Sequence, residues 1–147
     1  MEAVIFVGLQ GAGKSSFFQE RFAATHVRVN LDTVKTRARE RALVESCIAN
    51  RQSFVVDNTN PTAAERAHYI QPAKAAGYTI IGYYFDVDVK VCLARNAQRT
   101  GKARIHPAGI YGARKRMQPP TLEEGFDAIY IVRLTSAGSF EVSHQSS

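Results

Sequence analysis

A glycine-rich segment near the start of the chain constrains the fold more than any other stretch. Residues 8–15 read G-L-Q-G-A-G-K-S; they follow the apolar run 3–7, which is typical of a buried strand, and they open onto a helical pattern that begins near Gly13. Glycines let consecutive backbone N–H groups turn inward around a phosphate, and the helix N-terminus adds the positive end of its dipole. Lys14 can reach the outer phosphates, and the Ser15 hydroxyl can bind Mg²⁺.

This pattern predicts a phosphate-binding loop (P-loop) for a nucleoside triphosphate, with ATP and Mg²⁺ as the expected cofactors. A glycine-rich turn with an incidental lysine is the simpler alternative, but three glycines followed by Lys-Ser directly after a strand favour the P-loop. The residues expected to bind the nucleotide are Gly8, Gly11, Ala12, Gly13, Lys14, Ser15 and Ser16.

The chain has the length of one domain, 147 residues, and its 45% hydrophobic content is typical of globular proteins. We expect residues 1–147 to form a single P-loop kinase domain, with a lid over about residues 95–117 and a polar tail over about residues 136–147 that is mobile at its end. No apolar run approaches the roughly 20 residues of a membrane span, and no basic leader precedes the P-loop. Cys47 and Cys92 are isolated, which predicts no disulfide partner and no zinc site and is typical of a reducing cytoplasm.

The rest of the chain alternates strand-like and helix-like patterns. One helix is expected to be capped by Asp32 or Thr33 and to run to about Arg51; the next is expected to begin at Pro61 with Asn60 as N-cap. This alternation predicts an α/β three-layer sandwich around a five-stranded, mainly parallel sheet. Besides the first strand, strands are expected at residues 26–29, 54–57, 78–85 and 129–132. The solvent face of the second helix is expected to carry Arg37, Arg39, Glu40, Arg41 and Glu45.

Two acidic residues follow strands of the predicted sheet. The carboxyl ends of parallel strands meet at one edge, where ligands bind, so we expect the P-loop, Asp32 and the turn at 57–60 to share one crevice. Asp57 ends an apolar strand, the usual position of an acid that contacts Mg²⁺ or its waters, here together with Ser15. Asp32 is then free to act as general base for an acceptor hydroxyl. The simpler alternatives are a helix N-cap for Asp32 and a turn-forming acid for Asp57.

The net charge of +6 is concentrated in one region. No acidic residue occurs between Asp88 and Glu123; outside this block 11 Lys and Arg face 13 Asp and Glu, so the rest of the chain carries −2. Arg95 and Arg99 are four residues apart and share a helix face, which we expect to close over the nucleotide as a lid. The alternatives are arginines that complement the helix dipole and a solvated positive face. The eight basic residues are Lys90, Arg95, Arg99, Lys102, Arg104, Arg114, Lys115 and Arg116.

Five segments carry motifs whose order and spacing match a known family. They are G-L-Q-G-A-G-K-S at Gly8, V-N-L-D-T at Val29, V-D-N-T-N-P at Val56, R-N-A-Q-R at Arg95 and P-P-T-L-E-E-G-F at Pro119. Together they resemble the polynucleotide 5′-hydroxyl kinases, including the kinase half of polynucleotide kinase–phosphatases. The resemblance implies an adenylate-kinase-like P-loop core with a basic helical lid, which transfers the γ-phosphate of ATP to a 5′-hydroxyl end of DNA or RNA.

The resemblance also implies roles for individual residues. Family members often have arginine directly before the catalytic aspartate, where this chain has Leu31, and Lys35, one turn beyond, is expected to compensate in binding the acceptor. The catalytic residues that it implies are Asp32 as general base, Lys14, Arg95 and Arg99. The acceptor-binding residues are expected to be Lys35, Asp57, Asn58 and Thr59, and the metal-binding residues Ser15 and Asp57.

The sequence therefore predicts an ATP-dependent polynucleotide 5′-hydroxyl kinase that acts in nucleic-acid repair. A phosphatase or ligase does not fit within 147 residues, so any processing of 3′ ends is expected to come from elsewhere. Two alternatives stay open: a kinase for a sugar, nucleoside or antibiotic on the same scaffold, and a nucleotide-binding module without transfer activity.

Overall fold

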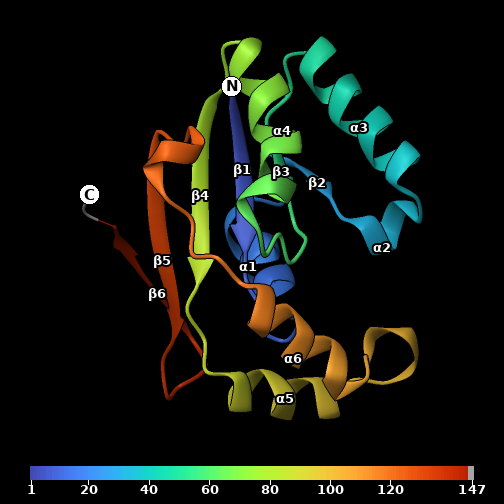
Figure 1. Ribbon diagram of the computed structural model, residues 1–147, viewed down its shortest axis with the longest axis vertical. Helices are drawn as coiled ribbons and strands as arrows, with labels where there is room; N and C mark the ends of the chain where they lie inside the picture. Colours follow the sequence, from blue (N-terminus) through green and yellow to red (C-terminus); the bar gives the residue numbers. More distant parts are fainter. Residues whose placement is uncertain (146–147) are drawn as a thin grey trace.

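The computed structural model describes residues 1–145, except for the side chain of Lys102. A six-stranded sheet with the order β2-β3-β1-β4-β5-β6 forms its centre (Figure 1). The first five of these strands pair in parallel, and β6 runs antiparallel to β5. The strands are β1 (Glu2–Val7), β2 (Val27–Val29), β3 (Phe54–Val56), β4 (Thr79–Phe85), β5 (Ala128–Leu134) and β6 (Phe140–His144).

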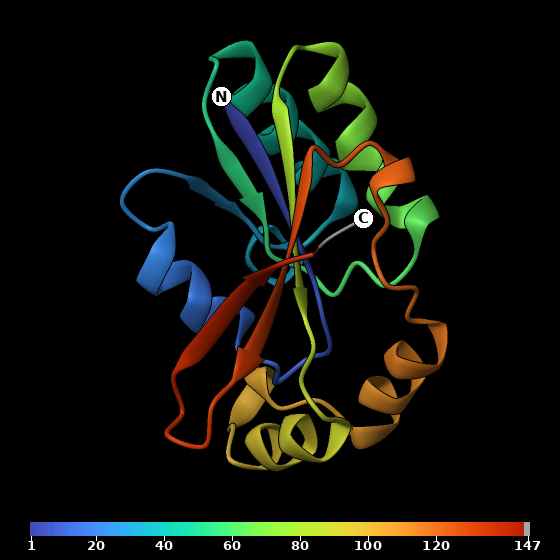
Figure 2. The same cartoon turned by 90° about the vertical axis from the view of Figure 1, so that its left-hand side faces the viewer.

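Helices cover both faces of this sheet. Figure 2 shows α1 on one side and α3 with α4 on the other, while β1, β4 and β5 point toward α5 and α6. This arrangement confirms the predicted α/β P-loop fold. No helix of the described residues is long and apolar enough to cross a membrane. The helices are α1 (Lys14–Arg21), α2 (Leu31–Val34), α3 (Arg37–Ala49), α4 (Ala63–Ala75), α5 (Val89–Ala97) and α6 (Pro107–Arg116), with 3₁₀ turns η1 (Gly101–Ala103) and η2 (Leu122–Glu124).

Strand β1 lies at the centre because its side chains are apolar on both faces. Ile5 joins the core beneath α3 and α4, whereas Phe6 joins the core that contains Phe17 of α1, and all three are buried. Such a strand is stable only between two other strands and under helices on both faces. It pairs with β3 and β4, and this position places the loop that follows it in the middle of the sheet edge.

The predicted number of strands was too low by one. The sixth strand, β6, lies within residues 136–147, which were expected to form a polar tail. The last two residues of that expected tail, 146–147, lie outside the described part of the chain. The alternating sequence F-E-V-S-H lets Phe140 and Val142 pack against the α1 face while polar residues face outward. Gly138, with φ 81°, makes the turn that returns the chain to β5.

The predicted long helix after β2 is two helices. Lys35 adopts φ 80° and ends α2, and Thr36 then caps α3 by accepting from the backbone N–H of Arg39. The N-cap of α2 is Asn30, whose Oδ1 lies 3.1 Å from the Thr33 nitrogen, so the expected caps were wrong. Asp32 consequently lies in the first turn of α2, and its carboxylate is not used as a cap.

The start of α4 also differs from the prediction. Thr62, not Asn60, is the N-cap. Asn60 instead adopts φ 47° and donates from Nδ2 to the Phe6 carbonyl at 2.8 Å, which attaches the turn after β3 to β1. Asp88 caps α5 by accepting from the Lys90 backbone N–H, and His106 caps α6 by accepting from that of Ala108.

A buried ion pair connects α4 to η2. Arg66 has no solvent exposure, and its guanidinium donates to both carboxylate oxygens of Glu124, at 2.7 and 2.9 Å. Arg66 also donates to the Asn60 carbonyl at 2.9 Å, while Glu124 accepts from the Thr121 backbone. The pair thus connects the turn after β3 with the segment that leads into β5.

Substitution of Glu124 by Ala tests this connection. The change leaves the Arg66 guanidinium buried without its counter-charge, so we expect the free energy of unfolding to fall by about 3–5 kcal/mol. Urea denaturation measures the difference. The control is Asp86→Asn, which removes the half-exposed pair with Arg133 and should change stability by less than about 1 kcal/mol. Equal effects of the two changes would contradict this role.

Candidate active site

The P-loop lies between β1 and α1, with α5 packed directly on it. Gly11 and Gly13 have φ values of 86° and 100°, which favour glycine. A Cβ atom at Gly11 would lie 2.5 Å from the Cys92 carbonyl oxygen, so this position also lacks space for a side chain. The structure therefore places the predicted loop glycines where backbone conformation and close packing both require them.

Lys14 lies over the P-loop in the structure. Its Nζ donates to the Gly8 and Leu9 carbonyls at 2.8 and 2.7 Å. Burial lowers the pKa of Lys14 to about 8, and the negative charge of Asp57 partly opposes that shift. A phosphate that reaches Lys14 would favour the charged ammonium form.

The acid at the end of β3 contacts the loop residue Ser15. The Ser15 hydroxyl donates to Asp57 Oδ2 at 3.3 Å, and the Asp57 side chain is only 2% exposed. Arg28 of β2 contacts both residues: its Nε donates to Asp57 Oδ2 at 2.8 Å and its Nη2 to Ser15 Oγ at 2.9 Å. The sequence analysis missed Arg28, although it directly precedes Val29, the last residue of β2, and therefore lies next to a strand end.

Ser15 and Asp57 fit a Mg²⁺ ion in chemical type. Mg²⁺ prefers oxygen ligands and is usually held by one or two protein groups together with phosphates and water. Within the described residues no group of three or more His, Cys, Asp and Glu could hold a metal ion without such help. Ser15 and Asp57 would hold the ion beside Lys14, where it would neutralise charge on the phosphates.

A hydrogen-bonded network holds the start of α2. Asn58 accepts from the Leu31 backbone N–H at 2.9 Å and donates to Glu40 Oε2 at 2.8 Å. Glu40 also accepts from the Tyr69 hydroxyl at 2.7 Å and from Arg37 at 2.9 Å. Burial and the neighbouring Glu40 raise the pKa of Tyr69, so its hydroxyl remains a donor.

This network corrects one prediction. Glu40 was expected on the solvent face of its helix, but it is buried, because α4 supplies Tyr69 and the turn after β3 supplies Asn58. The network ends at the Leu31 backbone, directly before Asp32, and so holds the first turn of α2 in place.

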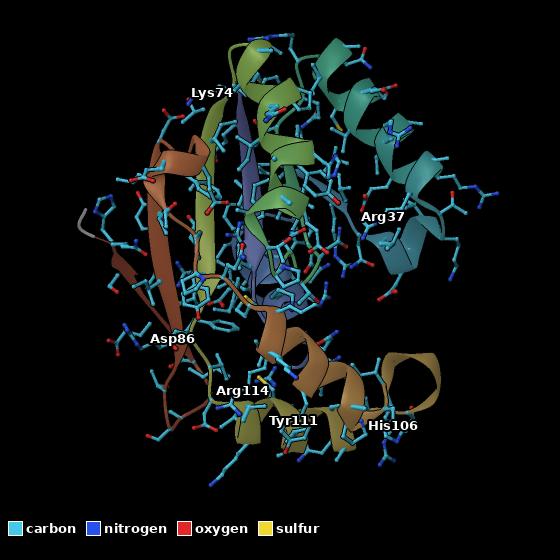
Figure 3. All side chains as sticks on the ribbon, in the orientation of Figure 1. Arg37, Lys74, Asp86, His106, Tyr111 and Arg114 are labelled. Carbon is cyan, nitrogen blue, oxygen red and sulfur yellow. The ribbon has the colours of Figure 1, made fainter. Side chains whose placement is uncertain are left out.

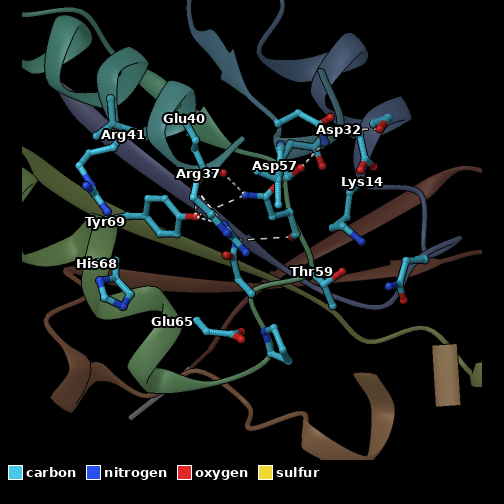
Figure 4. Close-up of a pocket in the computed structure, with 18 of the residues that line it drawn as sticks. Lys14, Asp32, Arg37, Glu40, Arg41, Asp57, Thr59, Glu65, His68 and Tyr69 are labelled. Carbon is cyan, nitrogen blue, oxygen red and sulfur yellow. Dashed lines mark hydrogen bonds and ion pairs between the residues drawn. The ribbon is translucent and has the colours of Figure 1, made fainter. Parts of the chain in front are cut away.

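One pocket of about 780 Å³ contains both the P-loop side and the α2 side (Figure 4). In Figure 4 Lys14 and Asp32 lie at one end, and Arg41, His68 and Tyr69 lie toward the other. The predicted site residues that line it are Gly11, Lys14, Ser15, Asp32, Asp57, Asn58, Thr59 and Arg99. Lining residues that the sequence analysis did not assign to the site include Gln10, Arg37, Glu40, Arg41, His68 and Tyr69.

The predicted site residues outside that pocket lining are Gly8, Ala12, Gly13, Ser16, Lys35 and Arg95. Lys35 is exposed at the C-terminal end of α2. Arg95 is half-buried beside the loop instead, with its Nη2 3.6 Å from the place of a Cβ atom at Gly13. Both assignments remain predictions.

The predicted lid consists of the end of α5, η1 and α6. Asn96 is buried and exchanges two hydrogen bonds with the Ile105 backbone, at 2.7 and 3.0 Å, which hold the connecting loop against α5. Arg99 lines the pocket from this segment. Arg114 projects from α6 in Figure 3, and the neighbouring Arg116 forms an ion pair with Glu65 of α4 at 3.3 Å. The lid thus already contacts the body of the protein.

A model of a protein family described as an AAA domain matches residues 4–120, which include the P-loop, the pocket and the lid. The chain belongs to this AAA domain family. It has a P-loop nucleotide-binding fold of the kinase type, as the sequence predicted.

The curated relatives confirm the resemblance to polynucleotide kinases. The chain is 27% identical over 129 residues to a bifunctional polynucleotide phosphatase/kinase of Schizosaccharomyces pombe, covering 85% of this chain and 32% of that protein. It is 33% identical over 146 residues to a protein of Acanthamoeba polyphaga mimivirus that carries a provisional form of the same name, covering 89% of this chain and 33% of that protein. The chain therefore spans about a third of the length of these relatives.

A solved sugar kinase from Janibacter sp. HTCC2649 has a similar fold. Its TM-score is 0.68 at 13% identity, over 90% of this chain and 85% of that chain. At this low identity the similarity describes the shared P-loop fold alone.

The pKa of Lys14 predicts a pH dependence of nucleotide binding by this AAA domain. As pH rises through about 8, the nucleotide-free protein loses the Lys14 proton, while the phosphates of a bound nucleotide favour the protonated form. Binding of ADP without Mg²⁺ should therefore take up a proton near pH 9 and weaken by up to about tenfold per pH unit above 8. Calorimetry in two buffers with different ionisation enthalpies measures the uptake. A Lys14→Met variant that takes up the same number of protons would contradict the assignment.

Proposed function

We propose that this domain transfers the γ-phosphate of ATP to a 5′-hydroxyl end of a polynucleotide. The observation that carries the proposal is that Lys14 and Asp32 line the same pocket, one from the P-loop and the other from α2. A phosphoryl donor and an acceptor hydroxyl can thus meet in one cavity. The names of the two curated relatives support a polynucleotide as the acceptor.

The residues of the pocket suit an in-line transfer. The Asp32 carboxylate accepts the proton of the acceptor hydroxyl, whose oxygen then bonds to the γ-phosphorus as the bond to the β-phosphate oxygen breaks. Lys14 and the P-loop amides hold the phosphates, and Arg99 offers positive charge from the lid. Mg²⁺ held by Ser15 and Asp57 would add further neutralisation. The products are ADP and the 5′-phosphorylated end.

The basic lid supports a polyanionic acceptor. Arg114, Lys115 and Arg116 are exposed in the last turn of α6, and Arg116 also lines the pocket. A nucleoside triphosphate needs fewer positive charges than the lid segment contains, so charge remains for the phosphates of a polynucleotide.

Transfer of labelled γ-phosphate to a panel of acceptors tests the proposal. We expect transfer to 5′-hydroxyl DNA or RNA oligonucleotides, with little transfer to sugars, nucleosides or antibiotics. Asp32→Asn should lower turnover by roughly 10²–10⁴-fold and leave ATP binding unchanged, because the proton acceptor is lost and the P-loop is intact. Asp86→Asn, an exposed acid outside the pocket lining, is the matched control.

Two outcomes of that panel would reject the proposal. Transfer to small hydroxyl compounds alone would identify a small-molecule kinase on the same scaffold. Nucleotide binding without transfer to any acceptor would identify a non-catalytic nucleotide-binding domain.

The salt dependence of oligonucleotide binding provides an independent prediction. Binding of a 5′-hydroxyl oligonucleotide should weaken steeply as salt rises, because each neutralised phosphate adds about 0.7 to the slope of log K against log salt for a single strand. Arg114→Ala should reduce that slope by about one phosphate contact. Lys74→Ala, at the opposite end of the molecule in Figure 3, should leave it unchanged. A flat response in the unaltered protein would contradict a polynucleotide acceptor. Fluorescence anisotropy of a labelled oligonucleotide measures each slope.

A further inference from the structure

Arg28 donates hydrogen bonds to Asp57 Oδ2 and Ser15 Oγ, the two oxygen atoms that are expected to bind Mg²⁺. Its Nε lies 2.8 Å from Asp57 Oδ2 and its Nη2 lies 2.9 Å from Ser15 Oγ, while those two oxygens lie 3.3 Å apart. Both contacts come from one planar guanidinium. The Arg28 guanidinium therefore lies on the two oxygens that would hold Mg²⁺.

The position of Arg28 follows from strand pairing. β2 pairs in parallel with β3, and the Asp57 backbone N–H donates to the Val29 carbonyl at 2.8 Å, so Arg28 lies beside the acid at the end of β3. Asp57 is 2% exposed, and a carboxylate this buried needs a counter-charge. Lys14 does not contact it, because its Nζ is bonded to the Gly8 and Leu9 carbonyls.

The Arg28 side chain is also free to move away from Ser15 and Asp57. It is 29% exposed, in contrast to its partner, and its aliphatic part extends from a strand at the edge of the sheet. An arginine side chain has several rotatable bonds and changes rotamer far faster than a backbone segment moves. Ser15 lies in the first turn of α1 and the buried Asp57 directly follows β3, so the partly exposed guanidinium is the group that can move aside.

We propose that Arg28 is a resident counter-ion that competes with Mg²⁺ for Ser15 and Asp57. It stabilises the nucleotide-free protein, and it must release both oxygens before they can face a metal ion that arrives with the nucleotide. The inference rests on nucleotide binding by the P-loop and not on the identity of the acceptor. Its consequence is that Arg28 weakens binding of the Mg²⁺–nucleotide relative to binding of the metal-free nucleotide.

Binding of fluorescently labelled ADP with Mg²⁺ and with EDTA tests this competition. The quantity measured is the ratio of the two dissociation constants, metal-free over Mg²⁺-containing. Arg28→Met should raise this ratio about tenfold, because two charge-assisted hydrogen bonds no longer oppose the metal. Arg39→Met is the matched control: it removes the same charge from an exposed site outside the pocket lining, and the ratio should stay unchanged.

Thermal unfolding separates this role from a merely structural one. Arg28→Met should lower the melting temperature of the nucleotide-free protein. The rise in melting temperature on addition of Mg²⁺–ADP should be larger for Arg28→Met than for the unaltered protein. A ratio of dissociation constants in Arg28→Met equal to that of Arg39→Met would overturn the proposal, as would an equal loss of stability with and without Mg²⁺–ADP.

A second variant keeps the test decisive if Arg28→Met does not fold. Arg28→Lys retains the charge but cannot bond Asp57 and Ser15 through one planar group, so the ratio should rise in the same direction by a smaller factor. An unchanged ratio in a folded Arg28→Lys protein would overturn the proposal. No acceptor is present in these measurements, so a failure of phosphate transfer to oligonucleotides leaves their outcome unaffected.

Discussion

Parallel pairing of β1 and β2 with β3 is the constraint on which the site depends. Ile5 of β1 and Val29 of β2 are both in register with Val56 of β3, so the carboxyl ends of the three strands lie at the same edge of the sheet. Backbone hydrogen bonds then join the loops that follow: Asp57 donates to Val29, and Gly8 donates to Thr59. A phosphate-binding loop, a carboxylate and the start of a helix thereby meet although they are far apart in the sequence.

Two of the segments that carry the family resemblance have a structural role in this arrangement. Arg66 bonds the Asn60 carbonyl in the D-N-T-N-P turn and the Glu124 carboxylate in the P-T-L-E-E-G-F segment. Asn58 of the same turn bonds the start of α2. These motifs therefore hold the turn after β3 and the start of α2 in place, so their residues have a packing role in this fold.

Most of the fold could be predicted because its signals are local. The apolar run of β1 and the glycines of the P-loop each depend on neighbouring residues only. Predictions failed where a distant partner decides the outcome. Glu40 has the sequence context of a solvated residue, yet Tyr69 and Asn58 bury it. The break at Lys35 was missed for a different reason: its signals, the caps Asn30 and Thr36, are local, but Asp32 or Thr33 was expected to be the cap instead.

The sequence alone determined the P-loop, the alternation of strands and helices, and the concentration of positive charge after Asp88, since these are properties of residue type and spacing. Only the tertiary structure decided which side chains meet at the site. Arg28 reaches Ser15 and Asp57 because β2 lies beside β3, and strand order is a long-range property that local patterns do not encode. The same holds for β6, whose half-exposed residues become a strand only when β5 offers its open edge.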